Sequence, residues 1–598
     1  MKYKKLISAM ALTAVVTAGL AACGGGGSKD GKKGKGEETE DIAKFPMKTS
    51  NDGKAVKGGT LEGAVVMDTQ FQGLFDAAFN SDNYDTYFMQ PSHETLFGFD
   101  KAFQMDDSGV ATFELDQKAK KGTIKIIKDA KWSDGKPLVA DDIIQPYLII
   151  GHPDYEGTGG VRYGENMQRI VGMKDYHDGK ADSISGIKKV DDKTVEIEYE
   201  KVEPGLLTAD GDGGPWQNAM PAHIFKDMPV KGMESSDAIR KNPVTYGPYK
   251  MTSVKRGEFV EYAPNEHYYG EKPKLDKIIM RQAPSNSIVE ALKAKKYDFV
   301  FSMPTDNYPT YKDVEGYEIL GREAFAYTYI GFKLGKWEDG EVKYNKDAKM
   351  ANKSLRQAMA YAVDNQAVAD KFYYGLRSSA NSLIPPVLGE MHDKDLKGYT
   401  QDLDKANKLL DDAGYKKKDG EEFRRDPKGE KLEIKFASMS GGETAQPLAE
   451  YYMDQWKEIG LDVQLTTGRL IDFNAFYDKL KNDDPEVDVY QGAWSVSYNP
   501  SQTPLYGPKA AFNYTRFASE ENSKLLADMD SDKSFDNEYR SKVFKEWQQY
   551  ASEEAFAIPT LFRNEVMPMN SRVKNFDWAI QKEHTGWADV ELTAESRK

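Results

Sequence analysis

The sequence contains a single cysteine, Cys23, among 598 residues. One cysteine cannot form an internal disulfide, and it excludes cysteine-rich metal clusters. The seven histidines are scattered, and no His-Glu-x-x-His zinc motif occurs. Basic residues are also in deficit, because 81 lysines and arginines face 96 acidic residues and leave a formal net charge of −15. This balance argues against a nucleic-acid-binding protein, which should present a basic face.

Two short patterns imitate ligand-binding motifs but lack their essential residues. The segment 159–166 has the glycine spacing of a P-loop, yet it ends in Glu-Asn where Lys-Ser or Lys-Thr must stand. The segment 528–539 begins like an EF-hand loop but lacks its turn glycine and its final glutamate. No Gly-x-Ser-x-Gly elbow is present. The sequence therefore predicts no metal, no cofactor and no catalytic residue, although carboxylate counting alone leaves a glycosidase open.

The N-terminus has the pattern of a lipoprotein signal peptide. Three lysines precede the apolar run 6–20, which is shorter than the about 20 residues that a membrane-spanning helix needs. The ending Leu-Ala-Ala-Cys23 resembles a bacterial lipobox, whose cysteine sulfur receives a diacylglycerol and becomes the first mature residue. We therefore expect removal of residues 1–22 and lipidation of Cys23. The alternative is a secretory signal with an incidental free cysteine.

The segment after the cysteine is rich in glycine and charge. Residues 24–41 contain no apolar side chain and cannot bury surface. We therefore expect a flexible tether over 23–57 that connects a lipid anchor in the cell membrane to an exported domain.

Strand-like and helix-like segments alternate along the rest of the chain, which predicts an α/β fold. The segments 432–436 and 461–465 alternate apolar and polar residues and flank a helical stretch at 443–459, as in a βαβ unit. Further helices are predicted at 354–374 and 402–413, and strands at 123–127, 194–199 and 487–490.

Six stretches, in this order, carry a resemblance to a known family: Lys131-Trp-Ser-Asp-Gly-Lys-Pro137, Asn242-Pro-Val-Thr-Tyr-Gly-Pro-Tyr249, Asn265-Glu-His-Tyr-Tyr269, Ser354-Leu-Arg-Gln-Ala-Met-Ala-Tyr-Ala-Val-Asp364, Asp404 to Gly414 and Glu554-Ala-Phe-Ala-Ile-Pro559. Together they resemble signatures of family 5 extracellular solute-binding proteins, the peptide- and nickel-type receptors of ABC importers. The lipobox and the length fit the oligopeptide-binding (OppA-type) branch.

The resemblance implies a two-lobe type II periplasmic-binding-protein fold with an extra subdomain in the first lobe. The two chain crossings between the lobes are expected near Arg322–Ile330 and Ala555–Phe562. The implied parts are lobe I at 58–321 with its subdomain at about 97–186, lobe II at 322–555, and a return to lobe I at 556–598.

The resemblance further implies a monomeric receptor that captures oligopeptides between its lobes and delivers them to ABC permease subunits with cytoplasmic ATPases. Such a receptor binds the main chain of an extended peptide and closes over it, without catalysis. A lipid-anchored receptor suits the outer face of a Gram-positive cell, where no periplasm retains a free one. The alternatives are a receptor for signalling peptides, oligosaccharide, nickel or haem, and a lipid-anchored hydrolase.

In the family, one lobe II stretch holds the peptide backbone, and the matching residues here are Trp494, Ser495, Val496, Ser497 and Tyr498. The family's aspartate, which pairs with the peptide's α-ammonium group, falls at Ser497. A serine cannot neutralise a buried ammonium. Either another acid such as Asp472 substitutes, or the amine is not clamped, which predicts long peptides in variable register. The plain alternative for Trp494 is a core aromatic beside the strand 487–490.

From lobe I, the family uses a segment that falls here at Asn80, Ser81 and Asp82, shortly before a helix end marked by Glu94 and Leu96. The alternative is that Ser81 or Asp82 only caps the start of a helix.

Overall fold

The computed structural model describes residues 40–598 except 81–82 and 209–213. Residues 39–598 form one compact unit. Cys23, the predicted signal peptide, Ser81 and Asp82 lie outside the described residues. Within the described part, every helix is too short or too polar to cross a bilayer.

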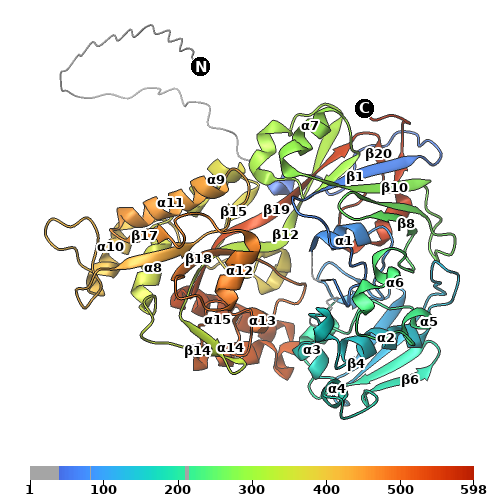
Figure 1. The fold of residues 1–598 in the computed structure, drawn as a ribbon, viewed down its shortest axis with the longest axis horizontal. Coiled ribbons are helices and arrows are strands. Elements are labelled where there is room, and N and C mark those ends of the chain that lie inside the picture. The colour runs from blue at the N-terminus through green and yellow to red at the C-terminus, as the bar shows by residue number, and fades with distance from the viewer. Residues whose placement is uncertain (1–39, 81–82, 209–213) are drawn as a thin grey trace, which may run out of the picture. The chain divides into compact units, whose positions relative to one another are not determined.

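One mixed sheet of eleven strands runs through this unit (Figure 1). Its order is β17-β16-β18-β12-β19-β11-β1-β10-β9-β8, with β15 also pairing β19. The bounds are β1 Thr60–Val66, β8 Tyr249–Lys255, β9 Phe259–Pro264, β10 Lys277–Ala283, β11 Phe299–Phe301, β12 Tyr317–Phe332, β15 Arg377–Ser379, β16 Glu433–Ala437, β17 Asp462–Leu465, β18 Val489–Ser495 and β19 Ala557–Asn570.

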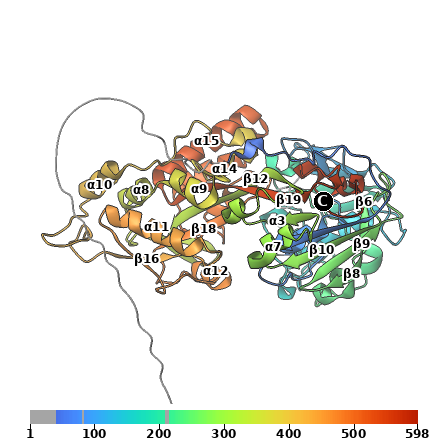
Figure 2. The same cartoon turned by 90° about the horizontal axis from the view of Figure 1, so that it is seen from above.

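Two long antiparallel strands, β12 and β19, connect two lobes, as Figures 1 and 2 show. The first half of β12 pairs only β19, and the second half also pairs β18 of lobe II. The register is interrupted between Glu323 and Tyr327, inside the first expected crossing. The largest hydrophobic core draws its buried residues from 327–562 alone, and another draws them from 74–246. The predicted α/β two-lobe fold is therefore confirmed.

Lobe I contains a separate four-stranded sheet with the order β4-β5-β7-β6. Its bounds are β4 Ala111–Asp116, β5 Lys121–Ile126, β6 Ile187–Asp191 and β7 Thr194–Glu198. The expected subdomain boundary at 186 is therefore too early, because β5 pairs β7 from Thr194 onward. Buried Trp132, which belongs to the first resembling stretch, donates its indole N–H to the carboxylate of Asp142 at 2.9 Å.

The remaining elements of lobe I are short. They are α1 Asn83–Met89, β2 Gly98–Phe99, β3 Met105–Asp106, α2 Ala140–Ile150, α3 Glu165–Gln168, α4 Met173–His177, α5 Ala222–Phe225, α6 Asp237–Arg240, α7 Ile288–Lys293, β20 Val573–Lys574 and β21 Glu591–Leu592.

Lobe II contains the predicted βαβ unit, with β16 and β17 parallel on either side of α11. The helix predicted at 354–374 is wrong, because two helices occupy it. Asp364 is extended and its carboxylate accepts the Ala367 N–H at 2.9 Å, so it caps a new helix. The bounds are α8 Lys353–Tyr361, α9 Asn365–Tyr373, α10 Leu403–Asp412, α11 Ala445–Glu458, α12 Phe473–Lys481, α13 Thr503–Tyr506, α14 Glu520–Met529, α15 Asn537–Glu554, β13 Gly335–Glu338 and β14 Glu341–Tyr344.

Residues 40–57, expected to belong to the flexible tether, instead pack on the body of the protein, and we call them the N-terminal strap. The Glu40 N–H donates to the Tyr374 carbonyl of lobe II at 2.8 Å, and Pro46 accepts from Gly321 of β12 at 3.0 Å. Gly321 has to be glycine here, since a Cβ would lie 2.7 Å from the Cβ of Phe45. The tether expectation is therefore wrong for this part, because its backbone polar groups find partners on both sides of the crossing.

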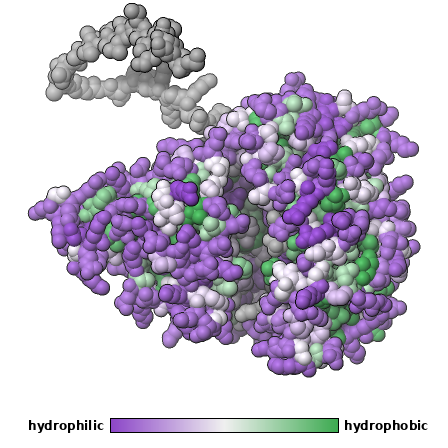
Figure 3. Space-filling view, viewed as in Figure 1, coloured by the Kyte–Doolittle hydropathy of each residue, from purple (hydrophilic) through white to green (hydrophobic). Residues whose placement is uncertain are grey.

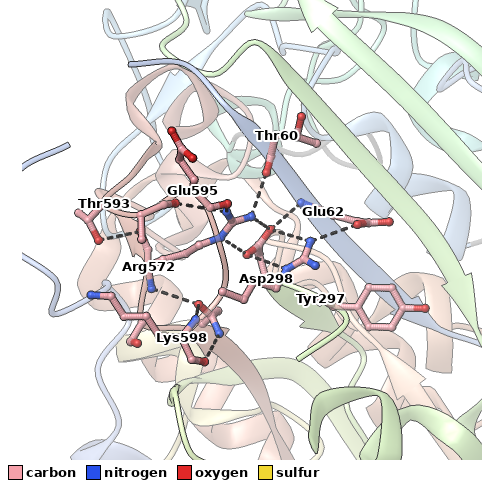
Figure 4. Close-up of polar contacts among 12 residues, drawn as sticks. Thr60, Glu62, Tyr297, Asp298, Arg572, Thr593, Glu595 and Lys598 are labelled. Carbon is pink, nitrogen blue, oxygen red and sulfur yellow. Dashed lines mark hydrogen bonds and ion pairs between the residues drawn. The ribbon is translucent and has the colours of Figure 1, made fainter. Parts of the chain in front are cut away.

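The returning C-terminal segment is fastened to lobe I by a buried ion network (Figure 4). Arg572 donates to both carboxylate oxygens of Asp298, at 2.7 and 2.8 Å, and to the Thr60 carbonyl at 3.0 Å. Arg597 also donates to Asp298 and reaches Glu62 at 3.1 Å. Asp298 is fully buried, so these contacts replace its hydration.

Candidate functional site

The predicted site stretch of lobe II follows the end of β18. Trp494 lies opposite Tyr327 of β12, and Ser495 lies opposite Ala326 as the last residue of the strand. The Val496 N–H continues the alignment by donating to the Phe325 carbonyl at 2.8 Å. The Ser495 side chain is exposed, and those of residues 496–498 are half-buried. This strand end is therefore in position to present main-chain groups to an extended ligand.

Trp494 belongs to an aromatic group at the surface of lobe II. Its ring stacks on Tyr514 at a centroid distance of 5.6 Å, and Phe512 packs against it edge-on at 5.8 Å. The Phe512 side chain remains 54% exposed. Buried Lys333 supports the group by donating to the Tyr514 carbonyl at 3.0 Å. Trp494 is half-buried, and it both packs against the hydrophobic core of lobe II and lies next to this exposed ring.

Tyr498 lies where the two lobes contact each other. Its ring stacks on Phe103 of lobe I at 5.0 Å and packs against Phe99 at 5.4 Å. Phe325 of the first crossing completes this interlobe aromatic cluster, at 5.0 Å from Tyr498. Sequence reasoning missed these three phenylalanines. The only signal for Phe99 and Phe103 was the aromatic density of the segment 97–103, and Phe325 lies inside the expected first crossing.

The lobes also approach each other near Asp530. Asp530 of lobe II accepts hydrogen bonds from Ser501 at 2.8 Å and from Thr503 at 2.6 Å. Burial raises the pKa of Asp530 to about 6, and the charge of Glu203 in lobe I contributes to the same rise. Close by, lobe I approaches so tightly that a Cβ on Gly205 would lie 2.7 Å from Nδ2 of Asn499. The acidic segment that imitates an EF-hand therefore serves this contact.

Figure 3 shows a hollow along the boundary between the lobes on a mostly hydrophilic face. Thr444 of lobe II donates to Asp306 at 2.9 Å at another point of this boundary. The lobes therefore touch at several separate points, and the predicted site residues 495–498 lie beside one of them.

Asp472, Ser497 and Asn80, three of the predicted site residues, make contacts with nearby parts of their own lobe. Asp472 is exposed and caps α12 by accepting the Ala475 N–H at 3.1 Å. Ser497 instead donates to the Asn499 carbonyl at 3.2 Å, and no hydrogen bond joins it to Asp472 in the described part. Asn80 is buried, and its main-chain carbonyl accepts from Arg162 at 2.9 Å. The structure thus brings Trp494 to Tyr498 together and places Asp472 and Asn80 in other local contacts.

Glu94, noted in the sequence only as a helix-end marker, is a buried carboxyl between two phenols. Tyr268 and Tyr269 each donate to it at 2.6 Å. Burial raises the pKa of Glu94 to about 7, against the two hydrogen bonds, which lower it. This contact gives the paired tyrosines of the third resembling stretch a structural role.

The described residues contain no group of three or more His, Cys, Asp or Glu side chains arranged to hold a metal ion.

The comparisons with known proteins agree with this geometry. The family model described as "Bacterial extracellular solute-binding proteins, family 5 Middle" matches residues 108–515. The oligopeptide-binding protein OppA of Lactococcus lactis subsp. cremoris (strain SK11) is 36% identical over 486 residues, which are 80% of each chain.

Two solved structures have the same fold. Lactococcal OppA, complexed with an endogenous peptide in the closed conformation, is 33% identical with a TM-score of 0.80, over 90% of this chain and all of that one. AppA from Bacillus subtilis, in complex with a nonapeptide, is 22% identical with a TM-score of 0.68, over 90% of this chain and all of that one. On the family model and the lactococcal relatives, this chain belongs to the family 5 bacterial extracellular solute-binding proteins.

Proposed function

We propose that this chain is an extracellular receptor that captures oligopeptides between its lobes and delivers them to an ABC importer. The observation that carries the proposal is the position of residues 495–498, which continue β18 and meet lobe I through Tyr498. The likeness to a peptide-bound, closed lactococcal OppA supports it.

The lobes proposed for this mechanism are residues 58–321 with 556–598, and residues 322–555. An extended peptide adds its own N–H and C=O groups to the end of β18, so side chains contribute little to recognition. The pairing of β12 with β19 is interrupted between Glu323 and Tyr327, and residues 324–326 form the hinge. A ligand that contacts both lobes favours the closed state, which the importer's permease then engages. No bond chemistry is required of the receptor.

The peptide's α-ammonium group is proposed to remain unclamped, because Ser497 is neutral and Asp472 caps a helix. Isothermal titration calorimetry with mixed peptides of tryptic length should give saturable binding, and N-acetylation should change the affinity less than about threefold. Ser497→Asp should then bind free-amine peptides roughly tenfold more tightly than acetylated ones, the gain of one charge-assisted hydrogen bond.

Ser497→Asn is the matched control, because asparagine has the size of aspartate without its charge. Absence of saturable binding by any peptide would overturn the receptor proposal, and hydrolysis of the peptides would favour the lipid-anchored hydrolase. If the unmodified protein bound N-acetylated peptides much more weakly than free-amine peptides, only the proposal of an unclamped α-ammonium group would be overturned.

The membrane attachment is proposed to be an acyl group on Cys23, which lies in the lipobox pattern. Cys23→Ala should move the protein from the membrane fraction to the medium with peptide binding unchanged, because two acyl chains are what hold such an anchor. Fractionation with immunoblotting measures this, and Ser28→Ala in the same glycine-rich segment should remain membrane-bound. Retention of Cys23→Ala in the membrane would contradict the anchor.

A further inference from the structure

Five aromatic rings form a continuous surface beside the site stretch of lobe II, and we call them the aromatic platform. The ring centres of Phe473 and Tyr477 lie 4.9 Å apart, and those of Phe512 and Trp494 lie 5.8 Å apart. Tyr514 connects the two pairs, at 5.9 Å from Tyr477 and 5.6 Å from Trp494. Phe473 and Phe512 are the only exposed phenylalanines of the described part. Exposed apolar surface next to a proposed ligand strand is typical of a binding surface.

The segment 511–516 carries two of the platform rings, and three charged side chains hold it in place. Lys333, at the end of β12, donates to the Asp483 carboxylate and to the Tyr514 carbonyl, the latter at 3.0 Å. Arg516 donates to the same oxygen of Asp483 at 2.8 Å and to two carbonyls of the segment itself at 3.0 and 3.1 Å. We call Lys333, Asp483 and Arg516 the ion triad.

The ion triad is enclosed, because its side chains are only 8%, 9% and 1% exposed. Two cations face one carboxylate, and the C-terminal end of α12 supplies further acceptors. The Leu480 carbonyl accepts from Lys333 at 3.2 Å, and the Lys481 carbonyl accepts from Arg516 at 3.1 Å. Cations are favourable at a helix C-terminus, so the second positive charge is compensated without a second carboxylate.

The other charged side chains near the ion triad have partners of their own. Asp488, whose main-chain carbonyl accepts the Lys333 N–H, pairs with Lys349 at 2.6 Å. Lys479 of α12 pairs with Asp484 at 2.5 Å. The ion triad is therefore a separate unit with its own charge balance.

Lys333 is the member of the ion triad that titrates nearest to neutral pH. Burial lowers the pKa of Lys333 to about 8, against the charge of Asp483, which raises it. Above this pH the lysine is neutral, and Asp483 remains paired with Arg516. Burial raises the pKa of the phenols around the triad above their usual range, so they stay neutral at pH 9: Tyr477, Tyr490 and Tyr514.

We propose that the ion triad is a positioning device for peptide binding, which fixes the segment 511–516 and with it two rings of the aromatic platform beside residues 495–498. Asp483 and Arg516 both have a positive φ, 52° and 55°, and such strained conformations persist only where surrounding contacts hold them. The inference rests on the proposed receptor function, since it names what orients the surface next to the peptide strand. The triad acts through the platform rings and does not itself touch the ligand.

Lys333→Met is the principal test, because it removes the lysine charge and leaves Asp483 paired with Arg516. Calorimetry with an N-acetylated peptide, whose N-terminus cannot titrate, should give about tenfold weaker binding at pH 7 than in the unmodified protein, as loss of one charge-assisted hydrogen bond predicts. The unmodified protein should itself bind about three- to fivefold more weakly at pH 9 than at pH 7, because Lys333 loses its proton in this range. Lys333→Met should bind equally at both pH values.

Lys349→Met is the matched control, because Lys349 pairs with an aspartate of the same lobe without contacting the segment 511–516. It should keep the affinity and the pH profile of the unmodified protein. Phe512→Ala tests the platform itself and keeps the ion triad intact, since this ring is exposed. It should also weaken binding, and its loss should not add to that of Lys333→Met, because both changes act on the same surface.

Three results would overturn the positioning role: an unchanged affinity of Lys333→Met at pH 7, a fall in its affinity at pH 9 equal to that of the unmodified protein, or fully additive losses with Phe512→Ala. A lower urea midpoint of Lys333→Met with unchanged affinity would assign the triad to stability alone and would overturn it as well. Absence of saturable binding in the unmodified protein would instead overturn the receptor proposal, and the positioning role with it.

Discussion

Asp298→Ala is expected to lower the free energy of unfolding by about 3–5 kcal/mol, because it leaves a buried arginine without its counter-charge. Asp298 is 0% exposed, and it accepts from Arg572, Arg597 and the Glu62 N–H. Urea denaturation followed by circular dichroism measures the loss. The effect should be largest in lobe I, to which this network fastens the C-terminal segment (Figure 4).

Asp412→Ala is the matched control, because Asp412 is exposed and pairs with Lys408 on one helix face. Such a surface pair is worth at most about 0.5 kcal/mol. The double change Asp298→Ala with Arg572→Met should cost less than the sum of the single changes, since the unpaired charge is then absent. A loss below about 1 kcal/mol for Asp298→Ala alone would contradict the proposed role of the network.

Tyr498→Ala is expected to weaken peptide binding about 30- to 150-fold, which corresponds to about 2–3 kcal/mol. Tyr498 packs on Phe99 and Phe103 across the lobe boundary, so its loss destabilises the closed state while the open state loses little. Calorimetry with a fixed peptide measures the change. Tyr361→Ala is the control, since this ring packs on Tyr399 within lobe II and should change the affinity less than about threefold.

Phe103→Ala tests the same contact from the other lobe. Its effect should not add to that of Tyr498→Ala, because the two rings are direct partners at 5.0 Å. Fully additive losses of binding free energy in the double variant, or an unchanged peptide affinity of Tyr498→Ala, would contradict the claim that the interlobe aromatic cluster stabilises the closed state.

Local patterns predicted those elements whose stabilising contacts are close in sequence. The unit of β16, α11 and β17 followed from alternation and helical spacing. The helix predicted at 402–413 is found as α10, and Asp402 caps it by accepting the Lys405 N–H at 2.9 Å. The break between α8 and α9 was missed because one side chain, Asp364, competes with the continuing helix for a backbone donor.

Long-range contacts could not be predicted in this way. β5 and β7 pair across about seventy residues, which periodicity does not encode, so the subdomain boundary was placed too early. The same limit applies to the site. The resemblance led to Trp494 and Tyr498, but the partners of Tyr498 are phenylalanines nearly four hundred residues earlier in the chain.

The N-terminal strap has a mechanical consequence. The Glu40 N–H donates to the Tyr374 carbonyl of lobe II, and the Gly321 N–H of a crossing strand donates to the Pro46 carbonyl, so the strap is attached beside the proposed hinge. A force acting on Glu40 would therefore reach the proposed hinge first, and not the tip of either lobe. Because the strap is attached beside the proposed hinge, either lobe can rotate with little displacement of the strap.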